Sequence, residues 1–598
     1  MLHALLDYAQ QAGISAEAGF RPKRVRWLLQ FTSNGDYRGV FPASNDRNGY
    51  EFPVAPHLQF SGKSTMRQFL VDTAQHAVLY GVDELDETQR AKHEYFIERL
   101  RDAADVEPVL GRIADALDDA DTLSHIRADL DNQTPKVKPS DNVTFVEMAE
   151  AGPRIIVEQA TWHDWWRSYW PTLFQKKEGK SKAKAKTGAS MRCFLSGELV
   201  QPARTHPKIK GLGDVGGNVE TTLVGFNCEA FCSHGLKQSA NAAMSTDAAE
   251  TYAAALNQLI ATQSKRLAGA RVVYWYTHDV PPEEDPINLA FDFGDAEVPD
   301  TDAEGAVDTK EHVVAQAVQR AGELVTAIRT GERPDLRGCR YRAMTLSGNA
   351  GRVVVRDWME GRFEDLAERV DRWFSDLRII HRHGQGLAPP PKFLAVLAAT
   401  VRTLKDVPSP LEAALWRSAI TGGPIPFEAM ARALRRVHTD VIKDNPANHA
   451  RMGLLKAYLI RKEICQMSET LNEYETHPAY LCGRIMAVLA AIQYRALPRV
   501  RAGVVQRYYA AASATPALVL GRLIRLAQTG HLPKIMHDSP GLAHWFDNEL
   551  AKIWTALDQR VPRTLTLEEQ SLFAMGYYQQ KAKRGPASQE DITDTIDH

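Results

Sequence analysis

The segment HPKIKGLGDVGGN, residues 206–218, spaces three glycines as G-x-G-x-x-G, at Gly211, Gly213 and Gly216. This spacing is that of the dinucleotide-binding fingerprint, which requires a buried strand before the glycines and a helix after them to hold the pyrophosphate. The residues before it, ARTHPKIK, contain no apolar run, and those after it, NVETTLVGFN, follow a strand pattern. The context therefore argues against a Rossmann domain and places the glycines in a loop of a β-rich region.

The β-rich region extends on both sides of this loop. Strand-like runs recur from residue 191 to about 360, for example RVVYWYT (271–277) and RVVVRDW (352–358). The first 190 residues mix helical and strand patterns, and nearly everything after residue 360 is helical by periodicity. We predict an α+β multidomain fold with a mixed α/β N-terminal region, a β-rich central region and an all-α helical bundle at the C-terminal end. The predicted domains are residues 1–190 (with a basic loop at 176–188), 191–360 (with the glycine loop), 361–466 (a helical connecting domain) and 467–598 (the C-terminal helical bundle).

The overall composition is that of a soluble globular protein, with 598 residues of which 44% are hydrophobic and 24% charged. The formal net charge is only −2, so any nucleic-acid-binding surface must come from local segregation of charge. Six scattered cysteines indicate a reducing compartment. The sequence shows neither a signal peptide nor an apolar run long enough to span a bilayer. We therefore expect a cytoplasmic protein with no membrane partner.

Candidate catalytic and metal-binding residues form no complete motif. Cys228 and Cys232 are spaced C-x-x-x-C, which differs from the patterns of structural zinc sites. The pair His163–Asp164 resembles that of metal phosphohydrolases, but it lies among tryptophans without further ligands. We predict no catalytic residue, no metal and no cofactor. A metal-dependent nuclease or phosphohydrolase that uses these four residues is the alternative.

Cationic and small residues gather in and after the glycine loop. Four cationic residues precede the glycines: Arg204, His206, Lys208 and Lys210. Positive charge attracts phosphates, and glycine removes the side chain that would keep main-chain N–H groups away from a ligand. Carboxamide and hydroxyl side chains, which suit base edges, follow in FNCEAFCSHGLKQSANAAMS (226–245). The candidate residues for binding a nucleic-acid sequence motif are Lys208, Lys210, Gly211, Gly213, Gly216, Asn227, Gln238, Ser239 and Asn241. The alternative is a loop and helix cap in a β-rich core, with Ser245 or Thr246 capping the next helix.

A long basic segment lies in the C-terminal region. Thr476–His537 contains eight Lys or Arg residues and no Asp or Glu. The helical patterns keep an apolar stripe and place arginines off it, and Tyr494, Tyr508 and Tyr509 offer faces on which bases could stack. We predict a groove for a single nucleic-acid strand. The alternative is a solvated face that pairs with an acidic partner subunit. The predicted contacts with the strand are Arg495, Arg499, Arg501, Arg507, Arg522 and Arg525.

Five stretches of the sequence resemble one protein family. HPKIKGL (206–212), LVGFNCEAFCSHGLKQSANAAMS (223–245) and YAAALNQLI (252–260) are similar, in order and length, to the signature block of the large subunit of type I-C CRISPR Cascade. FLVDTAQHAVLYG (69–81) and LSGNAGRVVVRDW (346–358) fit the same family. The resemblance implies a non-enzymatic subunit of an RNA-guided surveillance complex. Such a subunit recognises the protospacer-adjacent motif in duplex DNA, aids R-loop formation, holds the displaced non-target strand and recruits a helicase-nuclease.

The resemblance also implies partners and roles for single residues. The partners are the Cascade backbone subunits that carry the guide RNA, target double-stranded DNA, the helicase-nuclease and a small subunit. Under this resemblance we assign Lys208 and Lys210 to phosphates or the minor groove. We assign Asn227, Gln238 and Asn241 to base edges.

The small subunit of the family is the C-terminal helical region, translated separately from an internal start. Lys462–Glu463 can be encoded as AAG-GAG, a ribosome-binding sequence, and Met467 follows after three codons. We predict an internal start at Met467 and a fragment of residues 467–598 that copurifies with the complex.

Overall fold

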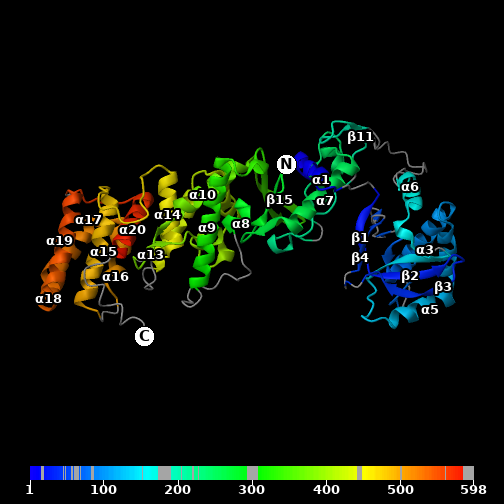
Figure 1. The fold of residues 1–598 in the computed structure, drawn as a ribbon, viewed down its shortest axis with the longest axis horizontal. Helices are drawn as coiled ribbons and strands as arrows, with labels where there is room; N and C mark the ends of the chain where they lie inside the picture. Colours follow the sequence, from blue (N-terminus) through cyan, green and yellow to red (C-terminus); the bar gives the residue numbers. More distant parts are fainter. Residues whose placement is uncertain are drawn as a thin grey trace. The chain divides into compact units, whose positions relative to one another are not determined.

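The structure of the chain is a computed structural model, which Figure 1 shows coloured along the sequence. It divides into two compact units, which we call the N-terminal and the C-terminal unit. The N-terminal unit comprises Leu2–Pro207 and Gly225–Ala255, and the C-terminal unit comprises Met1, Lys208–Val224 and Leu256–His598. The structure describes residues 1–14, 19–44, 46, 49–54, 58–59, 66–67, 69–82, 86–150, 152–170, 172, 190–203, 205–218, 221–226, 228–291, 307–349, 351–384, 386–440, 448–498, 502–558 and 560–583.

The N-terminal unit is built around a five-stranded sheet in the order β3-β2-β8-β7, with β9 paired to β8. Its strands are β2 (Trp27–Thr32), β3 (Tyr37–Pro42), β7 (Asp72–Thr73), β8 (Asn142–Ala149) and β9 (Gly152–Ile155). In β2, Trp27, Leu29 and Phe31 are buried while the alternate residues are partly exposed, so one face of the strand enters the core. Strands β2 and β8 run parallel, and the helices between them in the sequence supply the crossover that a parallel pair requires.

Helices and short strand pairs complete the N-terminal unit. The helix α3 begins at a capping box, in which the main-chain N–H of Gln89 donates to Asp86 Oδ1 at 2.6 Å. The ring of Trp166 in α6 stacks on Phe69 with centroids 5.1 Å apart, so the tryptophan-rich segment packs into the core. The helices are α1 (Leu2–Gln11), α2 (Ala74–Ala77), α3 (Glu87–Asp102), α4 (Pro108–Asp118), α5 (Ala120–Asp131) and α6 (Ala160–Tyr169). The strand pairs are β1 (Arg21–Val25) with β4 (Tyr50–Val54), β5 (Leu58–Gln59) with β6 (Met66–Arg67), and β10 (Met191–Arg192) with β11 (Leu199–Val200).

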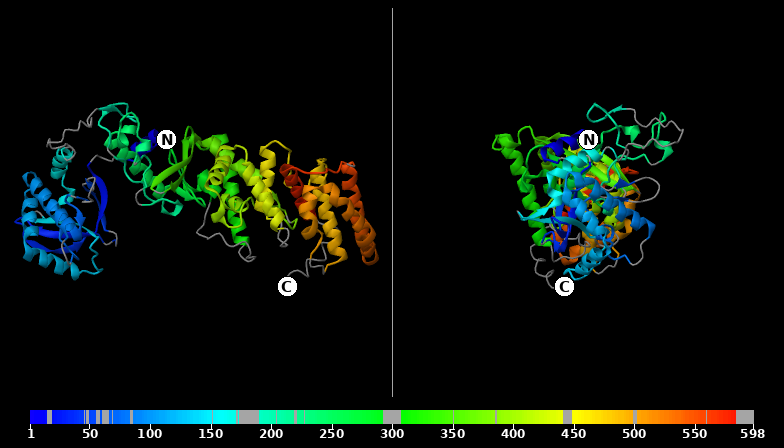
Figure 2. Two further views of the ribbon diagram at one scale, coloured as in Figure 1. Left: turned by 180° about the vertical axis from the view of Figure 1, so that it is seen from behind. Right: turned by 90° about the vertical axis from the view of Figure 1, so that its right-hand side faces the viewer.

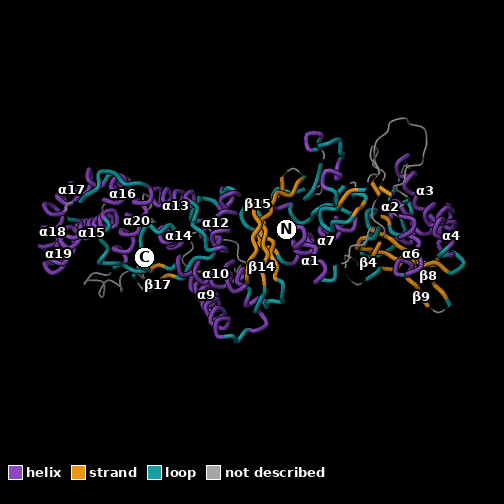
Figure 3. Tube along the Cα trace, turned by 90° about the horizontal axis from the view of Figure 1, so that it is seen from above, coloured by secondary structure: helices purple, strands orange, loops and turns teal. Residues whose placement is uncertain are grey.

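The C-terminal unit contains a four-stranded antiparallel sheet in the order β12-β13-β14-β15. Its strands are β12 (Ser264–Arg266), β13 (Arg271–Tyr276), β14 (Arg340–Asn349) and β15 (Arg352–Arg362), and Figure 3 shows the two long strands from above. One face of the sheet, with Val272, Tyr274 and Tyr341, packs into the main hydrophobic core. The helix α7 (Thr246–Thr262) precedes β12 and contributes residues to both units.

Most of the remaining C-terminal unit is helical, and Figure 2 shows it from two further directions. Helices α15 and α20 cross at glycines, because a side chain on Gly483 would collide with the main chain of Phe573, and one on Gly576 with that of Tyr480. The helices are α8 (Pro286–Phe291), α9 (Val307–Thr330), α10 (Phe363–Leu377), α11 (Phe393–Ala398), α12 (Ser409–Thr421), α13 (Phe427–Asp440), α14 (His449–Arg461), α15 (Pro478–Ala496), α16 (Val504–Ala514), α17 (Pro516–Leu526), α18 (Leu532–Asp538), α19 (Pro540–Leu557) and α20 (Leu567–Ala582). A short pair, β16 (Ile379–Ile380) and β17 (Leu387–Ala388), follows α10.

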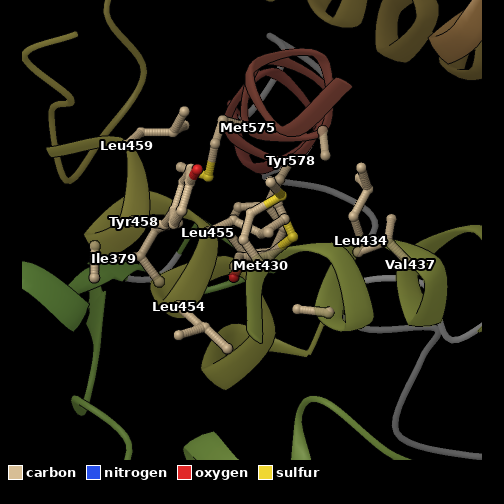
Figure 4. Packing of buried hydrophobic residues seen from close by; sticks show 14 of the residues in the cluster. Ile379, Met430, Leu434, Val437, Leu454, Leu455, Tyr458, Leu459, Met575 and Tyr578 are labelled. Atoms are coloured by element: carbon tan, nitrogen blue, oxygen red, sulfur yellow. The ribbon is translucent and has the colours of Figure 1, made fainter. Parts of the chain in front are cut away.

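Helices on both sides of residue 467 share one hydrophobic core. The helices α13 and α14 contribute Met430, Leu455 and Tyr458 to it. The helix α20 contributes Met575 and Tyr578, which lie beside them in Figure 4. The C-terminal bundle is therefore packed directly on the helices that precede it.

The predicted α+β multidomain fold with a helical C-terminal region is confirmed. The unit boundaries at Pro207, Val224 and Ala255 fall inside the predicted 191–360 domain. The boundaries between the four predicted domains stay a prediction. Among the helices of the described residues, none combines the length and the apolar character needed to cross a lipid bilayer.

Candidate nucleic-acid interface

The segment Lys208–Lys210 is held at both of its main-chain edges. On one edge the N–H of Ile209 donates to the carbonyl oxygen of Thr221 at 2.8 Å. On the other edge the N–H of Lys210 donates to Oδ1 of Asn257 at 2.7 Å, and Nδ2 of Asn257 donates to the carbonyl oxygen of Lys208 at 3.1 Å. Alternating edges are the pattern of an extended chain, so the segment is a short strand-like piece with fixed main-chain direction.

This piece continues the edge of the four-stranded sheet. Thr222 forms an antiparallel bridge with Lys208 and a parallel bridge with Arg352 at the start of β15. Ile209 is buried, Lys210 is exposed and Lys208 is half-buried. Partial burial lowers the pKa of Lys208. The two lysines therefore belong to a rigid edge of the C-terminal unit.

The glycines bring the main chain close to other parts of the same unit. Gly211 has φ +79°, and a Cβ there would lie 2.7 Å from Cγ2 of Ile260 in α7. Gly216 has φ +86°, and a Cβ there would lie 2.8 Å from the carbonyl oxygen of Gly348 at the end of β14. Around Gly213, by contrast, a Cβ would meet open space. Two of the three glycines are thus required by the fold itself, whatever ligand the loop binds.

The acidic residue of the loop is paired within the protein. Asp214 Oδ2 accepts a hydrogen bond from Arg271 at 2.6 Å and lies 3.5 Å from Nε of Arg266. These contacts tie the loop to β12 and β13. They also give the Asp214 carboxylate two cationic partners, Arg266 and Arg271, within the same unit.

His206, which the sequence groups with the cations, carries no charge at neutral pH. It is buried in the N-terminal unit, where its Nδ1 lies 2.7 Å from the hydroxyl oxygen of Tyr252. Burial lowers the pKa of His206 to about 4. The interpretation of His206 as a phosphate-attracting cation is therefore corrected, because desolvation favours the neutral imidazole.

The carboxamide-rich segment forms a separate, internally braced loop in the N-terminal unit. Asn241 Oδ1 accepts the main-chain N–H of Ser233 at 2.8 Å, and its Nδ2 donates to the carbonyl oxygens of Leu236 at 3.2 Å and Gln238 at 2.9 Å. His234 (φ +50°) and Gln238 (φ +49°) adopt the left-handed conformation that is uncommon for residues with a side chain. Asn241 thus uses both ends of its carboxamide to shape the loop.

The predicted motif-binding residues are divided between the two units. Lys208, Lys210, Gly211, Gly213 and Gly216 belong to the C-terminal unit, and Gln238, Ser239 and Asn241 belong to the N-terminal unit. Gln238 is exposed, and Ser239 is buried. Asn227 and Arg204 lie outside the described residues.

The basic segment of the C-terminal helices presents exposed arginines. Arg495 on α15, Arg507 on α16, and Arg522 and Arg525 on α17 are exposed, whereas Arg499 and Arg501 lie outside the described residues. Tyr494 is 71% exposed, so its ring is accessible for stacking.

Two residues of the basic segment serve the core instead. Arg484 is buried, where its Nε donates to Oε1 of Gln580 at 2.8 Å. Tyr509 is buried against Phe573 and Tyr577, with ring centroids 5.5 and 5.1 Å away. The prediction that Tyr509 offers a stacking face is therefore wrong, because the ring packs inside the bundle.

A family model described as CRISPR-associated protein (Cas_Csd1) matches residues 4–584. The chain belongs to the CRISPR-associated Csd1 family. A search of curated proteins gives no match. The resemblance drawn from the glycine loop and the segment after it is confirmed at the level of the family.

His163 and Asp164, which the alternative nuclease site would use, contact nearby aromatic and cationic side chains. The ring of His163 packs edge-on against Trp162 with centroids 4.3 Å apart, and Asp164 forms an ion pair with Arg167 at 2.5 Å. Cys228 is exposed and Cys232 is half-buried, both as free thiols. Within the part of the chain that the structure describes, no group of three or more His, Cys, Asp or Glu side chains is arranged to hold a metal ion.

Asn257 braces the candidate interface, and sequence reasoning missed this residue. Its position in YAAALNQLI gave one usable signal, since asparagine is unfavourable in a helix interior and competes for main-chain hydrogen bonds. The partners of its carboxamide lie 47 and 49 residues away in the sequence. Only the folded structure brings them together.

Proposed function

We propose that this Csd1-family protein is the non-catalytic large subunit of a type I-C CRISPR surveillance complex. In this role it recognises the protospacer-adjacent motif in duplex DNA, aids R-loop formation, holds the non-target strand and recruits the helicase-nuclease. The observation that carries the proposal is the braced edge Lys208–Lys210. It presents two cations on a main chain that is held at both edges.

A fixed basic edge suits a phosphate backbone better than a small-molecule pocket. Phosphate contacts set the register of a protein on a duplex, while side chains at base edges supply sequence preference. Lys210 is exposed and Lys208 is partly exposed, and both carry the positive charge that phosphate contacts require. We assign both lysines to positioning the duplex.

Motif readout is assigned to the braced loop of the N-terminal unit. Gln238 is exposed, and its carboxamide carries a donor and an acceptor, as a bidentate contact with a base requires. Asn241 is already engaged with the loop main chain, so its role is to hold that loop in shape. Asn227 stays a proposed base contact.

The exposed arginines of the C-terminal helices suit the displaced strand. Arg507, Arg522 and Arg525 lie on successive helices, α16 and α17, and Tyr494 at the end of α15 adds an aromatic face. Backbone-tracking cations with interspersed aromatic rings are typical of single-strand binding. The proposed partners are the Cascade backbone subunits with their guide RNA, target DNA, the helicase-nuclease and a small subunit made from Met467.

The proposal is tested with the assembled complex on duplexes with and without the motif. Lys208→Ala should weaken binding to both duplexes, because a phosphate contact carries no sequence information. Gln238→Ala should weaken binding only to the motif duplex, by about 1–3 kcal/mol. Lys405→Ala, an exposed lysine between α11 and α12, is the matched control and should bind as wild type. A wild-type complex that binds both duplexes equally would refute motif recognition.

The non-target strand is tested separately with single-stranded DNA. A variant with Arg507, Arg522 and Arg525 changed to alanine should lose affinity, and its binding should depend less steeply on salt. Equal salt dependence in the variant and the wild type would show that these arginines do not contact the strand.

A further inference from the structure

The carboxamide of Asn257 occupies the place of a neighbouring strand. In a sheet, the carbonyl oxygen of one residue and the N–H of the second residue after it point to the same edge and pair with the adjacent chain. Here the carbonyl of Lys208 and the N–H of Lys210 pair with the two ends of one side-chain amide from α7. The opposite edge pairs with Thr221 of the main chain. The segment is therefore closed on both edges, with one edge closed by a side chain.

Because both edges of the segment are paired, its main chain sets the direction and the spacing of the two lysine side chains. In an extended chain, alternate side chains point to the same face, and residues two apart are separated by about 6.6 Å. Ile209 between them is buried against the unit. Lys208 and Lys210 therefore share the face opposite to Ile209, at a spacing suited to successive phosphates of one nucleic-acid strand.

The main chain that carries Lys208 and Lys210 is already ordered before a ligand binds. Binding then fixes only side-chain rotamers, which lowers the entropy that association must overcome. An asparagine inside a helix is otherwise unfavourable. Its place in α7 is explained by the two hydrogen bonds that it makes outside the helix.

We propose that Asn257 is a positioning residue that sets Lys208 and Lys210 to contact two successive phosphates of one DNA strand. This inference rests on the proposed function of the basic edge as a DNA contact and deepens it. It assigns both lysines to phosphates and neither to a base edge or the minor groove. It also predicts that the two contacts act together.

The test measures the dependence of affinity on salt for the full-length chain and a duplex that lacks the motif. Each phosphate contact contributes about 0.9 to the slope of log affinity against log salt concentration. The variant with Lys208→Gln and Lys210→Gln should therefore lower the magnitude of the slope by about 1.8. Asn257→Leu should lower it by about 0.9 or more, and the lysine substitutions should have smaller effects in that background.

Two control variants, together with the slope itself, distinguish a loss of lysine positioning from a loss of folded protein. Gln258→Leu removes an exposed carboxamide from the adjacent position of α7, and Lys405→Gln removes an exposed lysine elsewhere in the unit. Both should keep the wild-type slope. Partial unfolding of a variant lowers the fraction of protein that binds, but the slope reports only the contacts made by the bound form.

An unchanged slope in the double lysine variant would overturn the assignment to phosphates. An unchanged slope in Asn257→Leu, together with a reduced slope in the lysine variant, would overturn the positioning role of Asn257. The duplex in this test lacks the motif, so the measured salt dependence does not rely on motif recognition. A failure of motif recognition would be seen in the separate binding assay with the assembled complex.

Discussion

Gly576 on α20 and Tyr480 on α15 approach so closely that a methyl group on the glycine would collide with the tyrosine carbonyl oxygen. Gly576→Ala should therefore force the two helices apart and destabilise the C-terminal unit by about 3 kcal/mol. Thermal unfolding of the full-length chain measures the effect. Gly521→Ala in α17 is the matched control. Open space surrounds that position, so the substitution should stabilise by about 0.5–1 kcal/mol. Equal melting temperatures for the two variants would show that the α15–α20 crossing is looser than described.

His206 makes the stability of the N-terminal unit depend on pH. Burial lowers the pKa of His206 to about 4, below its ordinary value of 6.5. A lowered folded-state pKa means that the unfolded chain binds the proton more readily, so the stabilisation is present above pH 6.5 and is lost as pH falls toward 4. At pH 5 the loss from this residue should be about 2 kcal/mol relative to pH 7.5. The measurement is the difference in melting temperature between wild type and His206→Gln across this range. A difference that does not change with pH would contradict the prediction.

Asn241 and Gln238 should have separable effects on the braced loop. Asn241→Leu removes the hydrogen bonds to Ser233, Leu236 and Gln238, so the amide protons of residues 233–238 should exchange faster with solvent. Motif preference should fall with it. Gln238→Ala should lower motif preference by about fivefold to 150-fold while amide exchange stays as in wild type. Slow exchange in Asn241→Leu would show that the loop is held by other contacts.

The separate fragment 467–598 should expose an apolar face. In the full chain α20 packs on α13 and α14, where Met575 and Tyr578 are buried, and Tyr509 of α16 lies against His438 of α13. Two further contacts would be lost, from Ser513 Oγ to Nε2 of His438 at 3.1 Å and from the Tyr458 hydroxyl to Glu568 Oε1 at 2.8 Å. The isolated fragment should bind a hydrophobic dye and associate as its concentration rises. Met575→Glu with Tyr578→Glu should reduce both signals. A monomeric fragment that binds no dye would show that its helices rearrange to cover the face.

Local patterns in the sequence were sufficient for much of the fold. The run RVVYWYT forms β13, where buried residues dominate, and RVVVRDW lies within β15. These elements follow from side-chain periodicity and β-propensity, which are properties of neighbouring residues. The family resemblance was likewise visible in short ordered blocks.

Burial and distant contacts limited the prediction of the site. His206 and Tyr509 have the composition of binding residues, but their charge state and accessibility depend on what packs around them. The reason for Gly216 is a carbonyl group at Gly348, more than a hundred residues away in the sequence. The carboxamide of Asn257 likewise acquires its role from a loop that is distant in the chain. Such contacts form by tertiary packing, and patterns among neighbouring residues in a single sequence do not predict them.

The glycines of the 206–218 segment also decide where a reporter group can be attached. A Cβ at Gly348 would collide with the main chain of Gly217, and one at Gly217 would lie 2.7 Å from the carbonyl oxygen of Leu212, so neither position can hold a cysteine for labelling. Gly213, with open space around it and no left-handed φ, can accept one at little steric cost. A fluorophore at this single point would sit within a few residues of Lys210, and its emission would show when an incoming ligand displaces the surrounding water.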